Sequence, residues 1–111
     1  MPKPAAAMPR RRVRGSRTGR PIMVLLDLLG RRWTLRILWE LRGDAPLTSR
    51  ALRTACDEAS PTVLNERLKE LRAAGFVELG GGGGYGLTPL GRELNATFLP
   101  LHRFAEKWTK S

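Results

Sequence analysis

The 111-residue sequence has very few of the side chains on which catalysis and metal binding depend. It contains one cysteine, Cys56, and one histidine, His102, so it can form no internal disulfide and no His–Cys zinc site. Neither a Lys-Ser nor a Lys-Thr pair follows the glycine run at 80–84, as it would in a phosphate-binding loop. These absences argue against an enzyme, and we expect neither a cofactor nor a metal ion.

Long apolar runs are absent as well. The stretch Ile22–Leu29 is short and is interrupted by Asp27, so it predicts neither a membrane span nor a signal peptide. We therefore expect a cytoplasmic protein. Cys56 lies in a predicted helix, where a lone thiol is usually a small core residue, with a redox-sensing thiol as the alternative.

Acidic residues are missing from the first twenty positions, which hold seven of the 20 Lys and Arg residues. This segment accounts for most of the formal net charge of +10, and it shows no apolar periodicity. We expect residues 1–20 to be a disordered basic arm that contacts the phosphates of a polyanion. A solvated tail that aids solubility is the alternative. The candidate DNA-binding residues of the arm are Arg10, Arg11, Arg12 and Arg14.

Residues 21–111 predict one domain that is mainly helical and has a small β-hairpin. A short edge strand is expected at Leu47, and Pro100 is expected to kink or restart the last helix. The two hairpin strands are expected at 76–79 and 85–87, joined by the five glycines. The apolar spacing predicts helices at about 21–30, 32–42, 49–56, 60–74 and from 88 onward.

The helix at 60–74 has clear signals at both ends. Ser60 is a good N-cap, Pro61 suits the first helical position, and Gly75 is expected as a left-handed C-cap. Its apolar stripe consists of Val63, Leu64, Leu68 and Leu71. With the helix at 49–56 it predicts a helix-turn-helix, and the hairpin that follows makes this a winged helix.

The outer face of the 60–74 helix carries the candidate base contacts, because the second helix of this motif enters the major groove. Asn65 can pair with adenine at two atoms, and Glu66 can accept from cytosine or pair with Lys69 or Arg67. Arg67 lies near the buried side, so its expected partner is a phosphate or an internal acid. An ordinary solvated face is the alternative. The candidate set is Ser60, Pro61, Thr62, Asn65, Glu66, Arg67, Lys69 and Arg72, the last two as phosphate contacts.

Apolar residues are more numerous on the terminal helices than a small core requires. Such a stripe usually packs against a partner chain, which predicts a homodimer built by the first and last helices. The expected interface consists of Leu94, Phe98, Leu101, Phe104 and Trp108 with Ile22, Leu25 and Leu26 of the first helix.

Three ordered motifs across residues 21–108 resemble the HxlR-type winged helix-turn-helix regulators, relatives of the MarR family. The segments are LLDLLGRRWTLRILWEL (25–41), SPTVLNERLKELRAAGFVE (60–78) and GLTPLGREL (86–94). The resemblance implies a homodimeric bacterial transcription regulator that binds operator DNA. Two departures stand out: Arg20–Pro21 replaces the Cys-Pro pair that some members use as a redox sensor, and the wing is short and uncharged.

These observations predict a DNA-binding transcriptional regulator, with repression as the default. One alternative is a protein-interaction module in which Thr62, Asn65 and Lys69 face an acidic protein. The other is sequence-neutral nucleic-acid binding driven by the basic arm. The residues identify no effector.

Overall fold

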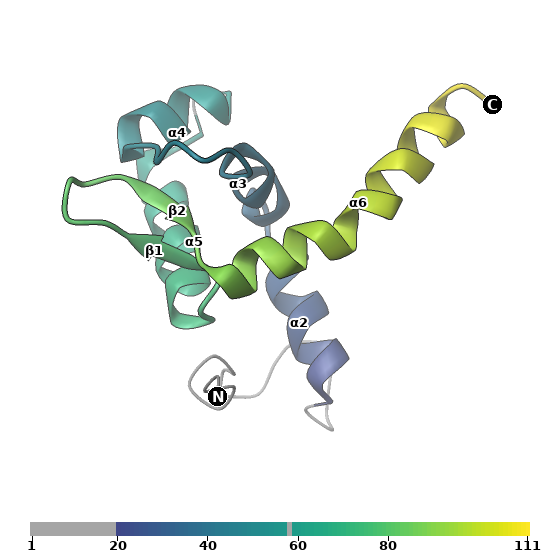
Figure 1. Ribbon diagram of the computed structural model, residues 1–111, viewed down its shortest axis with the longest axis horizontal. Coiled ribbons are helices and arrows are strands. Elements are labelled where there is room, and N and C mark those ends of the chain that lie inside the picture. The colour runs from purple at the N-terminus through teal and green to yellow at the C-terminus, as the bar shows by residue number, and fades with distance from the viewer. Residues whose placement is uncertain (1–19, 58) are drawn as a thin grey trace.

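The computed structural model describes residues 20–57 and 59–111, and the predicted basic arm lies outside the described residues except for Arg20. Figure 1 shows a helical body, with the hairpin on one side and the last helix extending away on the other. The expected fold, mainly helical with one small hairpin, is confirmed. In chain order the elements are α2 (Pro21–Leu29), α3 (Thr34–Glu40), α4 (Ser49–Ala55), α5 (Pro61–Ala73), β1 (Val77–Leu79), β2 (Tyr85–Leu87) and α6 (Pro89–Thr109).

Side-chain caps set the starts of three helices. The Thr48 hydroxyl accepts the N–H of Ala51 at 3.1 Å at the start of α4, and the Thr88 hydroxyl accepts the N–H of Gly91 at 3.0 Å at the start of α6. Ser60 caps α5 through a longer contact of 3.5 Å to the N–H of Val63. The predicted cap at Ser60 is therefore confirmed, and each of the three caps satisfies a backbone donor that has no partner inside its helix.

Gly75 ends α5 in the left-handed conformation that its sequence position predicts. Its φ is 87°, and its N–H donates to the Arg72 carbonyl at 3.0 Å. The N–H of Phe76 donates to the Leu71 carbonyl at 3.0 Å, which completes a Schellman motif. This turn leads the chain directly from α5 into β1, which starts one residue later than expected because Phe76 belongs to the cap.

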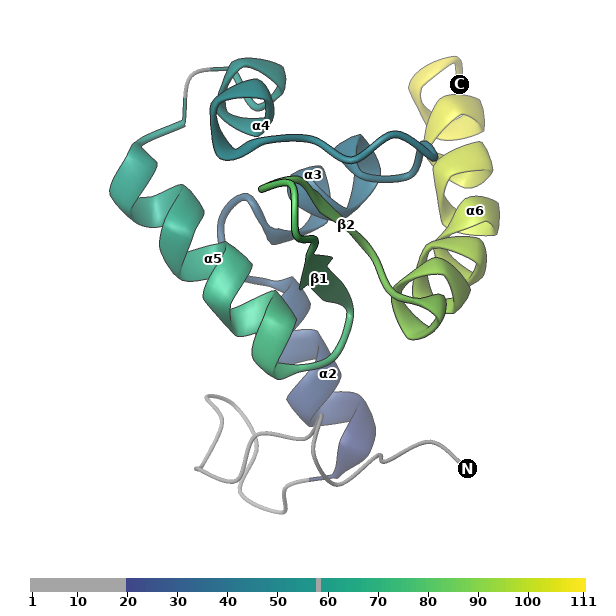
Figure 2. The same cartoon turned by 60° about the vertical axis from the view of Figure 1, so that its left-hand side comes forward.

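The hairpin is antiparallel and has the predicted strands. Val77 pairs with Leu87, and Leu79 pairs with Tyr85. Leu47 forms an isolated bridge to Tyr85 through two backbone hydrogen bonds of 2.7 and 3.0 Å, which confirms the expected edge strand. Figure 2 shows the hairpin between α5 and α6, which lie on opposite sides of the body.

One apolar cluster forms the core beneath α5 and the hairpin. Cys56 belongs to it and is fully buried, as expected of a small core residue. Leu94, which we predicted at a dimer interface, also belongs to it, because the first turns of α6 pack against the body. That prediction is wrong. The cluster consists of Leu28, Leu29, Ile37, Leu38, Leu41, Leu52, Cys56, Ala59, Leu64, Leu68, Leu71, Ala74, Val77, Leu87 and Leu94.

One helix prediction is wrong. Helix α3 begins at Thr34 rather than near residue 32, because Trp33 has a left-handed backbone with φ of 75°. Of the two outcomes expected at Pro100, a kink or a restart, the structure has the kink, because the last helix runs without a break from Pro89 to Thr109. Figure 1 shows the axis of α6 turning about halfway along, as expected where a proline removes a backbone donor.

Candidate nucleic-acid interface

Two arginines fix the turn that joins α4 to α5. Arg36 of α3 donates to the Ala55 carbonyl at 2.7 Å and to Asp57 Oδ2 at 3.2 Å. Arg53 of α4 donates to the Ala59 carbonyl at 3.1 Å. A hydrogen bond to Glu40 raises the pKa of Arg36 above its ordinary value, and this guanidinium stays charged. The start of α5 is therefore held by directional bonds from the two preceding helices.

The outer face of α5 is a continuous exposed surface. Leu64, Leu68 and Leu71 are buried on the opposite side of the helix. This division follows from the helical period, because positions three and four apart share a face. The exposed residues, all predicted as DNA contacts, are Ser60, Pro61, Thr62, Asn65, Glu66, Lys69 and Arg72.

Arg67 lies apart from this exposed face. Its Nη1 donates to both carboxylate oxygens of Glu70, at 2.7 and 2.8 Å, and its Nε donates to the Arg32 carbonyl at 3.1 Å. Only 17% of its side chain is exposed. Of the two partners expected for Arg67, the structure shows the internal acid, and that acid is Glu70 rather than Glu66.

A second arginine also reaches Glu70, and sequence reasoning missed it. Nη1 of Arg31 lies 3.0 Å from Glu70 Oε2, and its Nη2 donates to Asp27 at 2.9 Å. Burial alone would lower the pKa of Arg31, but the hydrogen bonds to Asp27 and Glu70 raise it overall. The one available signal was the four-residue spacing between Asp27 on α2 and Arg31 just after it.

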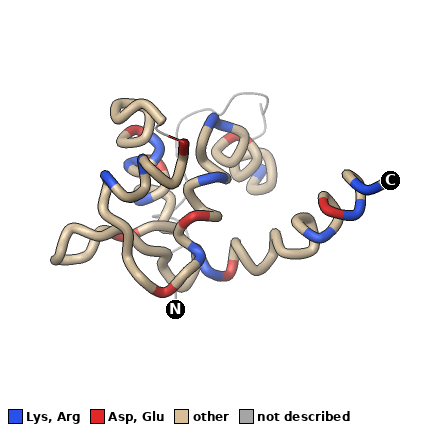
Figure 3. The backbone as a smooth tube through the Cα atoms, turned by 90° about the horizontal axis from the view of Figure 1, so that it is seen from above, with Lys and Arg blue, Asp and Glu red and all other residues tan. Residues whose placement is uncertain are grey.

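The wing carries no charge at its tip. Figure 3 shows the loop of the hairpin without a Lys, Arg, Asp or Glu residue. The loop closes through backbone bonds, from Gly80 N–H to the Gly84 carbonyl at 2.9 Å and from Gly83 N–H to the Gly80 carbonyl at 3.0 Å. Any cationic contact beside α5 must therefore come from another segment. The predicted arm residues Arg10, Arg11, Arg12 and Arg14 lie outside the described residues.

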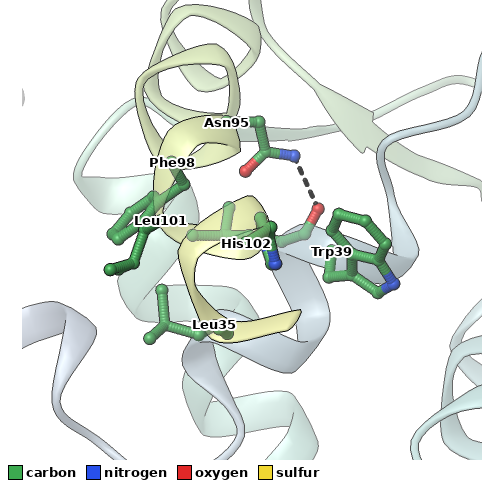
Figure 4. A pocket seen from close by; sticks show the side chains of 8 residues that line it. Leu35, Trp39, Asn95, Phe98, Leu101 and His102 are labelled. Atoms are coloured by element: carbon green, nitrogen blue, oxygen red, sulfur yellow. Dashed lines mark hydrogen bonds between the residues drawn. The ribbon is translucent and has the colours of Figure 1, made fainter. Parts of the chain in front are cut away.

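A pocket of about 220 Å³ lies between α3 and α6. Figure 4 shows Trp39 and His102 on facing helices, and their ring centroids are 4.3 Å apart. Leu35 and Leu101 also line the pocket and are themselves exposed, so its apolar wall continues onto the surface. His102 therefore packs against an aromatic ring at the surface of α6, away from the face of α5.

Two kinds of feature do not occur among the described residues, a metal-holding cluster and a membrane-spanning helix. Among these residues no three His, Cys, Asp or Glu side chains are grouped so that they could hold a metal ion. None of the described helices is both long and apolar enough to cross a bilayer.

Comparisons with known proteins identify the family. The family model described as HxlR-like helix-turn-helix matches residues 28–111. Quinone-bound YodB from B. subtilis is 33% identical, with a TM-score of 0.70 over 78% of this chain and 97% of that one. A possible HxlR family transcriptional factor from Thermoplasma volcanium is 28% identical, with a TM-score of 0.71 over 82% and 86%. Diamide-treated YodB is 30% identical, with a TM-score of 0.59 over 78% and 92%.

A comparison with curated protein sequences gives no match. The matched family model and the structures agree with the resemblance carried by the three sequence motifs. The fold is a winged helix-turn-helix, and the similar protein from Thermoplasma volcanium is described as a possible transcriptional factor. This chain belongs to the HxlR-like helix-turn-helix family of DNA-binding transcriptional regulators.

Proposed function

We propose that the protein is a homodimeric repressor that binds a pseudo-palindromic operator, with α5 of each subunit in one major groove. The observation that carries the proposal is the exposed polar face of α5, which runs opposite its buried leucines. A recognition helix needs such a face, because base edges are read by side chains that project from it. A bound dimer would repress by covering the promoter.

The residues of this face have different roles in the proposal. Asn65 pairs with adenine through its amide, and Glu66 accepts from the amine of cytosine. Thr62, in the first turn of α5, contacts bases or phosphates. Ser60 does the same, because its hydroxyl accepts the N–H of Val63 and can still donate its own proton. Lys69 and Arg72 lie further along the helix and bind phosphates, which positions the helix without specifying sequence. Arg67 is excluded because it lies off the exposed face and its Nε and Nη1 already bond to the Arg32 carbonyl and to Glu70.

Exposed apolar side chains on α2 and α6 support the homodimer. Ile22 and Leu26 of α2 are 56% and 53% exposed, and Leu101, Phe104 and Trp108 of α6 are 56%, 58% and 67% exposed. Of the other predicted interface residues, Leu25 and Phe98 are partly buried against the core. Full burial of one large apolar side chain contributes about 1.5–3 kcal/mol, and a two-fold interface buries each residue twice. A second copy is therefore the natural cover for this surface.

The basic arm supplies the cationic contact that the wing lacks. Disordered arms in other DNA-binding folds reach the minor groove or the phosphates beside the recognition helix. Seven basic residues in positions 1–20, next to a domain with a neutral wing, support the same arrangement here. The arm adds affinity without sequence preference, because phosphate contacts read no bases.

We propose that this regulator does not respond to thiol oxidation. One of the similar structures is that of YodB treated with diamide, a thiol oxidant. The one thiol of the present chain is Cys56, which is fully buried in the core, and burial raises its pKa. A protonated, inaccessible thiol reacts slowly with oxidants and electrophiles.

Fluorescence anisotropy tests the proposal on DNA from upstream of the gene, with a shuffled duplex of the same composition as control. At about 0.15 M salt we expect the native sequence to bind roughly a hundredfold more tightly. Asn65→Ala should change the base preference, whereas deletion of residues 1–20 should weaken binding to both duplexes and flatten its salt dependence.

Two results would redirect the proposal. If Asn65→Ala leaves DNA binding untouched, the face of α5 serves another partner, as in an interaction module for an acidic protein. If both duplexes bind equally, and a selection from genomic fragments recovers no preferred sequence, the protein is a sequence-neutral binder driven by its arm.

A further inference from the structure

A chain of ion pairs joins α2 to the recognition helix α5. Asp27 of α2 accepts from Arg31 at 2.9 Å, and Arg31 lies 3.0 Å from Glu70 of α5. Glu70 also accepts two bonds from Arg67, whose Nε donates to the Arg32 carbonyl at 3.1 Å. Two guanidinium groups on one carboxylate therefore hold α5 to α2 and to the turn that follows α2.

These groups are shielded from water more than a surface ion pair is. The exposed fractions of the side chains are 6% for Asp27, 17% for Arg67, 24% for Glu70 and 25% for Arg31. By contrast, the pair between Arg92 and Asp44 spans 3.9 Å, and its side chains are 45% and 105% exposed. Salt screens shielded pairs less than exposed ones, so this network persists at the ionic strength of a cell.

The ion-pair network fixes the orientation of α5, which apolar packing alone does not determine. The buried leucines of α5 set its depth in the body, but apolar contacts have no preferred direction. Hydrogen bonds are directional, and an arginine that bridges two carboxylates fixes the angle between the elements that carry them. Arg31 lies in the turn just after α2 and bonds both to Asp27 on α2 and to Glu70 on α5, so it fixes the angle between these two helices.

We propose that Arg31 and Glu70 are positioning residues that set the distance between the two recognition helices of the dimer, and so select the half-site spacing of the operator. The inference rests on the proposed function, in which the exposed side of α2 helps to form the dimer. A change in the angle between α2 and α5 then displaces the two α5 helices in opposite directions about the two-fold axis. Half-site spacing is a geometric property of such a dimer.

The test uses the full chain and the operator recovered by selection, together with two duplexes whose half-sites are one base pair closer and one base pair further apart. Arg31→Gln removes the bridge, and Arg50→Gln is the matched control, because it removes the same charge from an exposed arginine of α4 that lies outside the network. For the wild type and the control we expect clear discrimination among the three spacings. For Arg31→Gln we expect that discrimination to fall by about tenfold, within the usual range of coupling between sites.

A merely structural role would lower stability and leave the spacing preference unchanged. Thermal unfolding is therefore measured for each variant, and Glu70→Gln, which keeps the shape of the side chain, replaces Arg31→Gln if the latter does not fold. Wild-type spacing discrimination in the folded variant overturns this inference alone. A wild-type protein that binds every duplex equally overturns the proposed function, and this inference with it.

Discussion

Replacing Gly91 with alanine should destabilise the protein, although the same change in an open helix is stabilising. Gly91 lies in the first turn of α6, where a Cβ atom would overlap the carbonyl oxygen of Phe76. That carbonyl cannot easily move away, because it accepts the N–H of Thr88 at 3.0 Å. The N–H of Phe76 is itself held by the Leu71 carbonyl in the cap of α5. The added Cβ would therefore meet a backbone carbonyl that hydrogen bonds hold in place.

The magnitude follows from two opposing effects. Alanine is favoured over glycine within a helix by about 1 kcal/mol. Overpacking a well-packed site costs about 1–3 kcal/mol, and more where the neighbour is rigid. Since the neighbour here is a hydrogen-bonded carbonyl, we expect the free energy of unfolding to fall by about 2 kcal/mol overall.

Urea unfolding at one protein concentration measures this change, since the apparent stability of the proposed dimer would depend on concentration. Gly86→Ala is the matched control, because a Cβ at Gly86 in β2 meets no atom within 4 Å. We expect the control to stay within about 0.5 kcal/mol of the wild type. If Gly91→Ala is as stable as the wild type, α6 does not pack on the hairpin as the structure shows.

Three further predictions concern single side chains. The Thr34 hydroxyl is buried without a hydrogen-bond partner among the described residues. In urea unfolding, Thr34→Val should therefore leave the free energy of unfolding unchanged or raise it by about 1 kcal/mol. A clear loss of stability would show that the hydroxyl has a partner. Burial raises the pKa of Cys56 in the folded protein above its ordinary value of 9.0. As pH rises, the thiol therefore ionises in the unfolded chain before it ionises in the folded one. Ionisation stabilises the unfolded chain, so the free energy of unfolding should fall as pH rises above 9.0. Cys56→Ala should remove this part of the slope, and an identical slope would contradict it. Phe104→Glu, at a side chain that is 58% exposed, should shift sedimentation from dimer to monomer with little change in the helical signal, and an unchanged dimer would place the interface elsewhere.

Much of the fold could be predicted from the sequence because its signals are local. Ser60, Thr48 and Thr88 each cap a helix within three residues of their own position, and Gly75 closes the cap of α5 with its immediate neighbours. The hairpin pairing follows from two short strands on either side of a glycine loop. Such features can be predicted without the tertiary structure. The spacing of the leucines on α5 is also local, and it indicates which face of that helix is exposed.

The errors come from contacts between distant segments. Nothing near Trp33 in sequence signals a left-handed backbone, so the start of α3 was placed too early. Leu94 belongs to the same apolar stripe as Phe104, and periodicity cannot show that only the first part of α6 packs on the body. The link between Arg31 and Glu70 spans 39 positions, and many arginines and acids in this chain could have paired instead.

The two halves of α6 differ because, among the described residues, the side-chain hydrogen bonds that join α6 to α3 and the residues just after it come from its first half. Near the end of α3 the N–H of Arg42 donates to the carbonyl three residues back, that of Trp39, at 3.2 Å. The Leu38 carbonyl, four residues back, is therefore left for the side-chain amide of Asn95, which donates to it at 2.8 Å. Arg92 adds longer bonds of 3.4 and 3.3 Å to the carbonyls of Arg42 and Gly43. Beyond Pro100 every residue of the helix is exposed. The first half therefore holds α6 to the body by capping α3, and the bend at the proline directs the apolar second half outward, where a second subunit can cover it.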